Sequence, residues 1–391
     1  MVSVVRIPHR VLDIELPPFD PLNLRAAALR AQGRDVISLG QALPYFPPPP
    51  SAVRAAQAAL SSSQVHFYST DPGRPSLRRA LAERLQQETG ADCAAEDLLI
   101  TAGANHAFAT ALTTLVNPGD EVVIPAPYFT NHHMQVRASG AIAIEAPVAD
   151  QTTYAVTWDD VARAVTMRTR AVVLCTPSNP TGATITPADG ERIVNELASR
   201  DICVISDETY MHFVYDGAHW SAASVSDWRR NVVVIGTFSK SFAMMGWRVG
   251  FVMADREICA QATKIQDAMI ICAPTISQIA VEAAVQEDWN YARGFHPEFR
   301  RRRQRLAERL ADVPGLRWVP TAGGFFAFVR VDGCADSNAL AIRLLEEAHV
   351  VTIPGAAFGR SGEGCLRVSY GSVAERHFDE ALERVAAHFE R

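Results

Sequence analysis

The strongest constraint on the fold comes from short apolar runs that each lead into a polar segment or follow closely on one. Five such runs occur, at 121–124, 171–174, 202–205, 232–235 and 250–253. Continuous Val/Ile runs are typical of strands that are buried on both faces. Amphipathic segments of helical length lie between several of them, such as 187–199, which starts with Pro187. This alternation predicts an α/β fold with a mainly parallel sheet that is covered by helices.

The polar segments follow the carboxyl ends of the predicted strands, which is where ligands bind in sheets of this kind. A chain of 391 residues also exceeds one ordinary core. We therefore expect a large domain over residues 51–288 that carries the sheet. Residues 1–50 and 289–391 are expected to form a smaller α+β domain, with a long helix near 298–311.

Composition and charge argue against several classes of partner. The net charge of -6 gives no reason to expect binding to nucleic acid. The basic cluster Arg300 to Arg303, with Arg305, is interpreted as a solvated helix face. Residues 1–10 contain no apolar run typical of a signal peptide, and Pro274 interrupts the longest membrane candidate, 268–285. The seven cysteines form no C-x-x-C pair, so we expect reduced thiols and a cytoplasmic protein without membrane contact.

Lysine is rare in this chain, occurring only at 240 and 264. Lys240 follows a predicted buried strand and lies close to Thr237, Ser239 and Arg248. A lysine in a pocket can have a lowered pKa and form a Schiff base with a carbonyl compound. The two hydroxyls and the planar guanidinium suit a phosphate group. This segment therefore predicts a site for a phosphorylated carbonyl compound.

Other strand ends supply groups that an aromatic ring would need. Asp207 can pair with a ring nitrogen, and Asn179 and Tyr210 can donate hydrogen bonds to a phenolate oxygen. Residues 101–105 open an apolar helical run, so their backbone N–H groups would point at an anion. Phe129 offers a flat apolar face on which a ring can stack.

Six motifs occur together over most of the chain. They are residues 39–49 (LGQALPYFPPP), Tyr68 with Gly73 and Leu77-Arg78, Asn179 to Gly182 (NPTG), Asp207 to Tyr210 (DETY), Ser239-Lys240 with Gly246 to Arg248, and Arg367 to Tyr370 (RVSY). In order and spacing the sequence resembles class I/II aminotransferases of fold type I, the aspartate and kynurenine aminotransferase superfamily. The resemblance covers about residues 35–391. It implies a pyridoxal 5'-phosphate enzyme that moves an amino group between an L-amino acid and a 2-oxo acid.

The resemblance also implies roles for individual residues. Lys240 would bind the cofactor covalently and act as acid and base, with Asp207 on the ring nitrogen and Asn179 and Tyr210 on the phenolic oxygen. The implied catalytic residues are Lys240, Asp207 and Tyr210. Phe129 completes the ring site, and the implied phosphate ligands are Gly103, Ala104, Asn105, Thr237, Ser239, Arg248 and, from a second subunit, Tyr68. That last role implies a homodimer.

The substrate side of the site is implied to involve Ala42, Asn179 and Arg367, with Arg367 gripping the α-carboxylate. Ala42 stands where the family usually has glycine, which leaves the substrate in question. His132 replaces a frequent tyrosine, and the adjacent pair His132 and His133 lacks metal-ligand spacing, so no metal site is predicted. The loop 43–46 and the phenylalanines Phe325 and Phe326 favour an apolar or aromatic substrate side chain.

Two alternatives remain open at this point. A lyase, a cyclising synthase or an oxidase on the same scaffold would need the same ring-binding residues. A regulator that binds the cofactor without catalysis would carry an added DNA-binding domain, and the family resemblance begins near residue 35, too early for one.

Overall fold

The computed structural model describes residues 6–390 of the chain. The predicted absence of a signal peptide at 1–10 therefore falls partly outside the described residues. The strands are β1 (Ile37–Ser38), β2 (Leu98–Thr101), β3 (Glu121–Ala126), β4 (Ile142–Pro147), β5 (Thr169–Cys175), β6 (Cys203–Asp207), β7 (Val232–Thr237), β8 (Gly250–Met253), β9 (Leu316–Arg317), β10 (Phe326–Val331), β11 (Val350–Val351), β12 (Ile353–Pro354) and β13 (Cys365–Ser369). The helices are α1 (His9–Leu12), α2 (Phe19–Ala31), α3 (Pro50–Ala59), α4 (Pro75–Thr89), α5 (Ala104–Leu115), α6 (Thr130–Ala138), α7 (Trp158–Ala162), α8 (Pro187–Ala198), α9 (Phe238–Ser241), α10 (Arg256–Ile270), α11 (Thr275–Glu287), α12 (His296–Ala311), α13 (Ser337–Arg343) and α14 (Glu375–Phe389).

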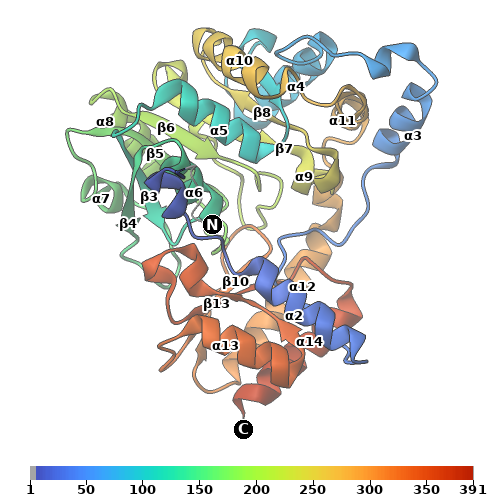
Figure 1. The fold of residues 1–391 in the computed structure, drawn as a ribbon, viewed down its shortest axis with the longest axis vertical. Coiled ribbons are helices and arrows are strands. Elements are labelled where there is room, and N and C mark those ends of the chain that lie inside the picture. The colour runs from blue at the N-terminus through green and yellow to red at the C-terminus, as the bar shows by residue number, and fades with distance from the viewer. Residues whose placement is uncertain (1–5, 391) are drawn as a thin grey trace.

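A seven-stranded sheet in the order β2-β8-β7-β6-β5-β3-β4 forms the upper part of the molecule (Figure 1). All its pairs are parallel except those that β8 makes with β7 and β2. Strand residues alternate between two cores, so Leu98 and Ile100 pack on one face and Leu99 on the other. Helices α4, α8 and α11 contribute to the first core, and α5, α6 and α10 to the second. The predicted α/β fold with a mainly parallel sheet is confirmed.

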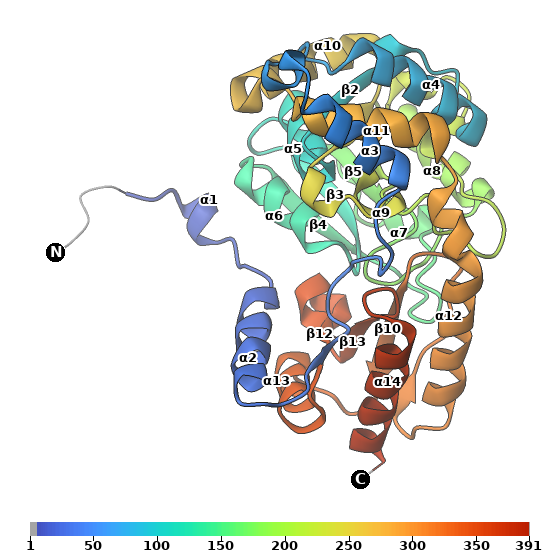
Figure 2. The same ribbon diagram turned by 90° about the vertical axis from the view of Figure 1, so that its right-hand side faces the viewer.

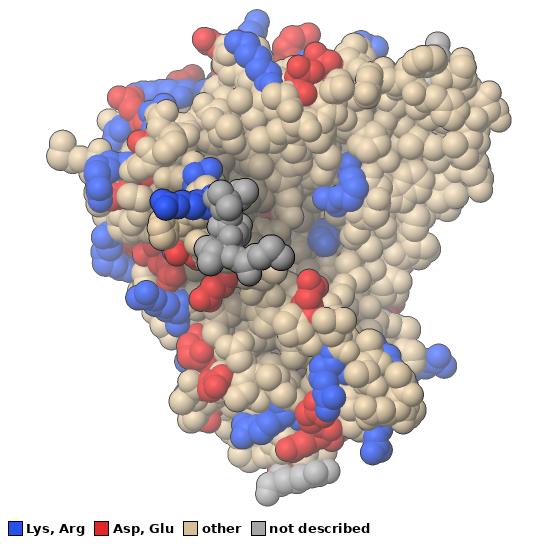
Figure 3. Space-filling view, in the orientation of Figure 1, with Lys and Arg blue, Asp and Glu red and all other residues tan. Residues whose placement is uncertain are grey.

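The lower part of the molecule is built around a four-stranded antiparallel sheet, β12-β13-β10-β9, and the short parallel pair β1-β11. Figure 2 shows α12 descending into this part beside α14. On the face drawn in Figure 3, basic and acidic side chains are intermixed, and the surface is hollowed between the two parts. No helix of the described residues is long and apolar enough to cross a membrane.

The interpretation of the arginine cluster on α12 is partly wrong. Arg301 and Arg305 are exposed, as expected for a solvated face. Arg302 is only 1% exposed. It shares the buried face of α12 with Phe299 and Leu306, because residues three and four apart lie on one side of a helix.

Candidate active site

The carboxyl ends of β5, β6 and β7 meet at one edge of the sheet and surround a cavity of about 180 Å³. Cys175 and Asp207 are the last residues of two neighbouring strands and pair in register. The cavity is lined by ten of the twelve residues predicted to bind the cofactor, Ala104, Asn105, Phe129, Asn179, Asp207, Tyr210, Thr237, Ser239, Lys240 and Arg248. Ala42, Cys175, Thr209 and Met245 complete the lining.

Lys240 lies on α9, a single turn that begins directly after β7. The Thr237 side chain caps this turn by accepting a hydrogen bond from the backbone N–H of Ser239 at 3.2 Å. The Nζ of Lys240 donates to the carbonyl oxygen of Ala42 at 2.6 Å. Burial, helped by the nearby Arg367 and Arg248 guanidinium groups, lowers the pKa of Lys240 to about 8. Such a lysine is partly neutral near pH 7 and can act as a nucleophile or a base.

Asp207 is buried and held by two donors. His132 Nε2 lies 2.9 Å from one carboxylate oxygen, and the backbone N–H of Thr209 donates to the other at 3.0 Å. Burial raises the pKa of the Asp207 carboxyl, but the hydrogen bonds from His132 and Thr209 outweigh it and hold that pKa below its ordinary value. Asp207 therefore presents a negative charge to the cavity.

The side of the cavity where the predicted phosphate ligands lie depends on a glycine. Gly103 has φ +85°, and a Cβ there would lie 2.5 Å from Nη2 of Arg248. The same guanidinium donates to the carbonyl oxygens of Met245 at 2.8 Å and Ala102 at 3.3 Å. It is thereby held at the start of α5, where free backbone N–H groups and the helix dipole favour an anion. Thr237 and Ser239 add two hydroxyls, 3.0 Å apart.

Arg367 does not line the cavity itself but lies beyond Asn179. Its Nη1 donates to Asn179 Oδ1 at 2.8 Å, and its Nη2 donates to the carbonyl oxygen of Gly40. The guanidinium is also 4.9 Å from the ring centroid of Phe358 and 5.2 Å from that of Phe326. Burial lowers the pKa of Arg367 to about 10, so it remains charged at pH 7. Its Nε is buried and has no hydrogen-bond partner in the described part of the chain.

Three predicted features lie elsewhere. Tyr68 is 75% exposed and does not line the cavity of its own chain. Tyr45 and Phe46, which favoured an apolar substrate side chain, face the lower part, where the Phe46 ring stacks on Phe295 at 4.0 Å. These two side chains therefore give no support for an apolar substrate. Gly103 lies behind the cavity wall rather than in it.

The sequence interpretation missed His132 as a contact of Asp207. It noted the histidine only as an unusual residue and as half of an adjacent pair. The available signal was its position three residues after Phe129, at the start of a helix that follows a strand end. Its neighbour His133 stacks on Tyr128 at 5.2 Å instead. Within residues 6–390, no three His, Cys, Asp or Glu side chains are grouped as a metal site would require.

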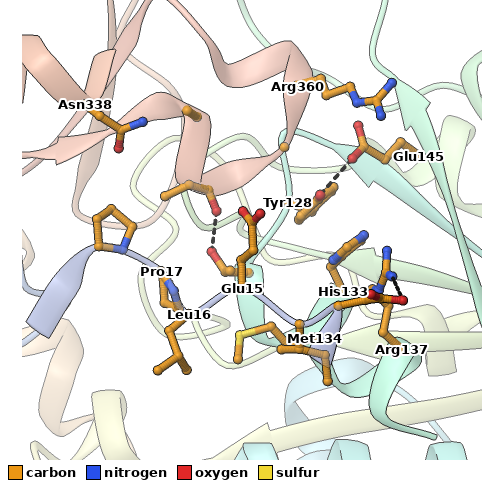
Figure 4. Close-up of a pocket in the computed structure, with 17 residues that line it drawn as sticks. Glu15, Leu16, Pro17, Tyr128, His133, Met134, Arg137, Glu145, Asn338 and Arg360 are labelled. Atoms are coloured by element: carbon orange, nitrogen blue, oxygen red, sulfur yellow. Dashed lines mark hydrogen bonds and ion pairs between the residues drawn. The ribbon is translucent and has the colours of Figure 1, made fainter. Parts of the chain in front are cut away.

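A larger cavity of about 460 Å³ lies beside the N-terminal segment (Figure 4). Glu15, His133, Arg137 and Arg360 are among its lining residues, and Tyr128 donates to Glu145 at 2.8 Å there. Its acidic and basic groups are mixed, and neither Lys240 nor Asp207 reaches it. We place the candidate site in the smaller cavity because Lys240, Asp207 and Arg248 converge there.

Comparison with known proteins agrees with this geometry. Residues 34–385 match the family described as Aminotransferase class I and II. An aspartate aminotransferase of Pyrococcus abyssi is 34% identical over 90% of this chain and 91% of its own. Aromatic-amino-acid aminotransferase 2 of Thermococcus litoralis is 33% identical, covering 96% of this chain and 97% of its own. The crystal structure of an aromatic aminotransferase from Pyrococcus horikoshii superposes with a TM-score of 0.86 at 34% identity, over 94% of this chain and 98% of the other.

Proposed function

Because the chain belongs to the class I and II aminotransferases, we propose that the cavity around Lys240 is where it binds pyridoxal phosphate and transfers amino groups. The protein is a pyridoxal-phosphate-dependent aminotransferase acting between an amino acid and a 2-oxo acid. The observation that carries the assignment to this cavity is the convergence of Lys240, whose pKa is lowered, with the buried carboxylate of Asp207.

The donors around the cavity fit this cofactor. The space at Gly103 that a Cβ would fill is taken by Arg248, and a Cβ at Gly250 would lie 2.9 Å from the backbone nitrogen of Ala104. Backbone N–H groups at the start of α5, the hydroxyls of Thr237 and Ser239, and Arg248 would hold the phosphate. Phe129 would stack on the ring and Asp207 would pair with its nitrogen. Asn179 and Tyr210 would bind the phenolic oxygen.

The chain's own groups then have definite tasks. When bound, the cofactor supplies an electron-poor ring that takes up the charge left on the substrate Cα. Lys240 Nζ would take up the proton from that Cα and deliver it to the cofactor carbon that keeps the amino nitrogen. Arg367 binds the α-carboxylate through its planar guanidinium, which Asn179 and the Gly40 carbonyl orient. Ala42 lies in the loop over the same region, with its carbonyl on Lys240.

We further propose that the enzyme is a cytoplasmic homodimer of biosynthetic amino-acid metabolism, with domains over 51–288 and over 1–50 plus 289–391. The exposed position of Tyr68 supports the dimer, since a second copy could take this side chain into its own site. The cavity lining supports an amino donor with an uncharged side chain, because no lining cation is left to pair with an acidic one in the described residues. Lys240 and Arg248 are the cations among the described residues that line it, and both have other tasks. A screen of the twenty amino acids against two or three 2-oxo acids identifies the donor.

The test of the proposed site uses covalent trapping. Purified protein is expected to be yellow, and borohydride is expected to fix the cofactor to Lys240. Lys240→Ala should abolish this covalent attachment of the cofactor. Lys264→Ala removes an exposed lysine that is hydrogen-bonded to Gln261, and it should leave the attachment intact. Cofactor found attached to Lys264 in the wild-type protein would contradict the assignment.

A further inference from the structure

The two largest fully buried side chains in the described residues are both arginines, Arg302 and Arg367. Arg367 has a place in the proposed reaction, but Arg302 does not contact the cavity. Burying a guanidinium is costly unless its donors are satisfied, and an apolar side chain could fill the same space without that cost. The contacts of Arg302 therefore call for an explanation beyond packing.

On one side, Arg302 holds the chain that follows Arg367. Its Nη1 donates to the carbonyl oxygens of Tyr370 at 3.1 Å and Val373 at 2.6 Å. These carbonyls lie just past the end of β13, the strand that carries Arg367. The backbone N–H of Ser369 in turn donates to the carbonyl oxygen of Leu39 at 2.7 Å, which ties this strand end to the loop that begins there.

On the other side, Arg302 holds that same loop further along. Its guanidinium lies 4.2 Å from the ring centroid of Tyr45, within the range of a cation–π contact. Its Nη2 also pairs with Glu298, and the Tyr45 hydroxyl donates to the other oxygen of that carboxylate. Tyr45 stands three residues after Ala42, whose carbonyl accepts from Lys240.

From these contacts we infer that Arg302 is a positioning residue for substrate recognition, which joins the loop 39–46 to the segment 367–373. The inference rests on the proposed function, because it treats Arg367 as the carboxylate ligand. Together the loop and the segment place Arg367 relative to Lys240. The residues of the same subunit that would bind the cofactor phosphate and ring nitrogen lie at the ends of β6 and β7, at the start of α5 and just before β8, and Arg302 has no described contact with them. Loss of Arg302 should therefore weaken binding of substrate carboxylates while leaving cofactor binding unchanged.

The experiment compares Arg302→Met with Arg301→Met in the cofactor-loaded enzyme. Arg301 is the adjacent residue on α12 and is exposed, and its ion pair within the described part of the chain is with Glu375. With L-leucine, L-phenylalanine or L-aspartate as donor and 2-oxoglutarate as acceptor, Arg302→Met should raise KM for both substrates about tenfold or more. The value of kcat should change less than KM, and the dissociation constant of pyridoxal phosphate should stay at the wild-type value. Arg301→Met should match the wild type throughout.

A second variant and a second measurement keep the inference testable if Arg302→Met does not fold. Tyr45→Phe keeps the ring beneath the guanidinium but removes the hydroxyl that donates to Glu298, so KM should rise about threefold. Hydrogen–deuterium exchange should quicken in peptides covering 39–46 and 367–373 in both variants. Unchanged KM and exchange in Tyr45→Phe and in folded Arg302→Met would overturn the inference. Absence of transamination by the wild-type protein would overturn the proposed function instead, and exchange would still show whether Arg302 joins the loop 39–46 to the segment 367–373.

Discussion

Lys240 owes its expected reactivity to where the chain places it. An exposed lysine is almost fully protonated at pH 7, whereas burial beside Arg367 and Arg248 lowers the pKa of Lys240 to about 8. Only the neutral amine attacks a carbonyl carbon. We therefore expect Lys240 to be a nucleophile near neutral pH, because burial and two nearby cations destabilise its ammonium form.

This pKa predicts how cofactor attachment depends on pH. In protein freed of cofactor, the rate of attachment should rise about tenfold per pH unit below pH 8 and level off above it. Arg367→Met removes a charge that lowers the pKa, so the midpoint should move to higher pH. Stopped-flow absorbance of added pyridoxal phosphate measures both. A midpoint near the ordinary lysine pKa in the wild-type protein would mean that Lys240 is solvated.

Asp207 and His132 provide a second prediction at this scale. Asp207→Ala should retain some cofactor but lower kcat about a hundredfold or more, because the ring nitrogen loses its negative partner. His132→Phe removes one hydrogen bond to that carboxylate and should cost about tenfold. Since that bond lowers the pKa of Asp207, its loss should move the acid limb of the kcat profile to higher pH.

The matched control is His133→Phe. His133 adjoins His132 in sequence but stacks on Tyr128 outside the candidate site. The His133→Phe substitution should therefore leave kcat and its pH profile unchanged. Equal effects of the two histidine substitutions would show that helix α6, rather than the contact with Asp207, matters. Near-normal turnover in Asp207→Ala would mean that another carboxylate serves the ring.

At the scale of elements, much of the fold could be predicted because buried parallel strands leave a plain signal. The apolar runs at 121–124 and 232–235 fall within β3 and β7, and the segment 187–199 matches α8 within one residue. The antiparallel direction of β8 could not be predicted, because a run buried on both faces looks alike in either direction. Nor could the burial of Arg302, since helical spacing alone does not tell which arginine will find buried carbonyl acceptors.

The turn between β2 and α5 carries a prediction of its own. Gly103→Ala should raise the dissociation constant of pyridoxal phosphate about tenfold or more, because the new Cβ would displace the Arg248 guanidinium. Gly33→Ala is the control, since Gly33 has a similar φ of +82° but nothing within 4 Å of an added Cβ. Both variants should lose about 1 kcal/mol of stability from backbone strain. Spectroscopic titration and thermal unfolding separate the two effects, and equal cofactor affinity in both variants would contradict the proposed cradle.

At the scale of the whole molecule, the candidate site draws on both parts of the chain. Asp207 ends β6 of the upper sheet and Lys240 lies on α9 directly after β7, whereas Arg367 comes from β13 in the lower part and Ala42 from the loop after β1. The motif residues could be found by resemblance, but their convergence required the tertiary structure. The direction of Tyr45 shows why, since its ring turns away from the cavity to meet Arg302.

Tyr68 extends this reasoning to a second chain. Its side chain is exposed in a single subunit, and its position in the family motif implies contact with the phosphate of the neighbouring subunit. If two chains build each site, two inactive variants can restore one another. Tyr68→Phe carries its lesion into the partner's site, whereas Lys240→Ala carries its lesion in its own site.

Mixing and refolding these two variants should therefore restore activity. In a heterodimer, one site would contain both lesions and the other would contain neither. With random pairing of an equal mixture, half of the dimers are heterodimers, and each holds one intact site. The mixture should therefore reach about a quarter of wild-type activity. Loss of a single hydroxyl can leave Tyr68→Phe too active for this test, and Tyr68→Ala paired with Arg248→Ala then serves the same purpose. The control is a chain that carries both Tyr68→Phe and Lys240→Ala, mixed with the Lys240→Ala chain. It should show no rescue, because both sites of every heterodimer are then damaged. Heterodimers shown to form at equal mixing, yet without activity, would place Tyr68 outside the partner's site.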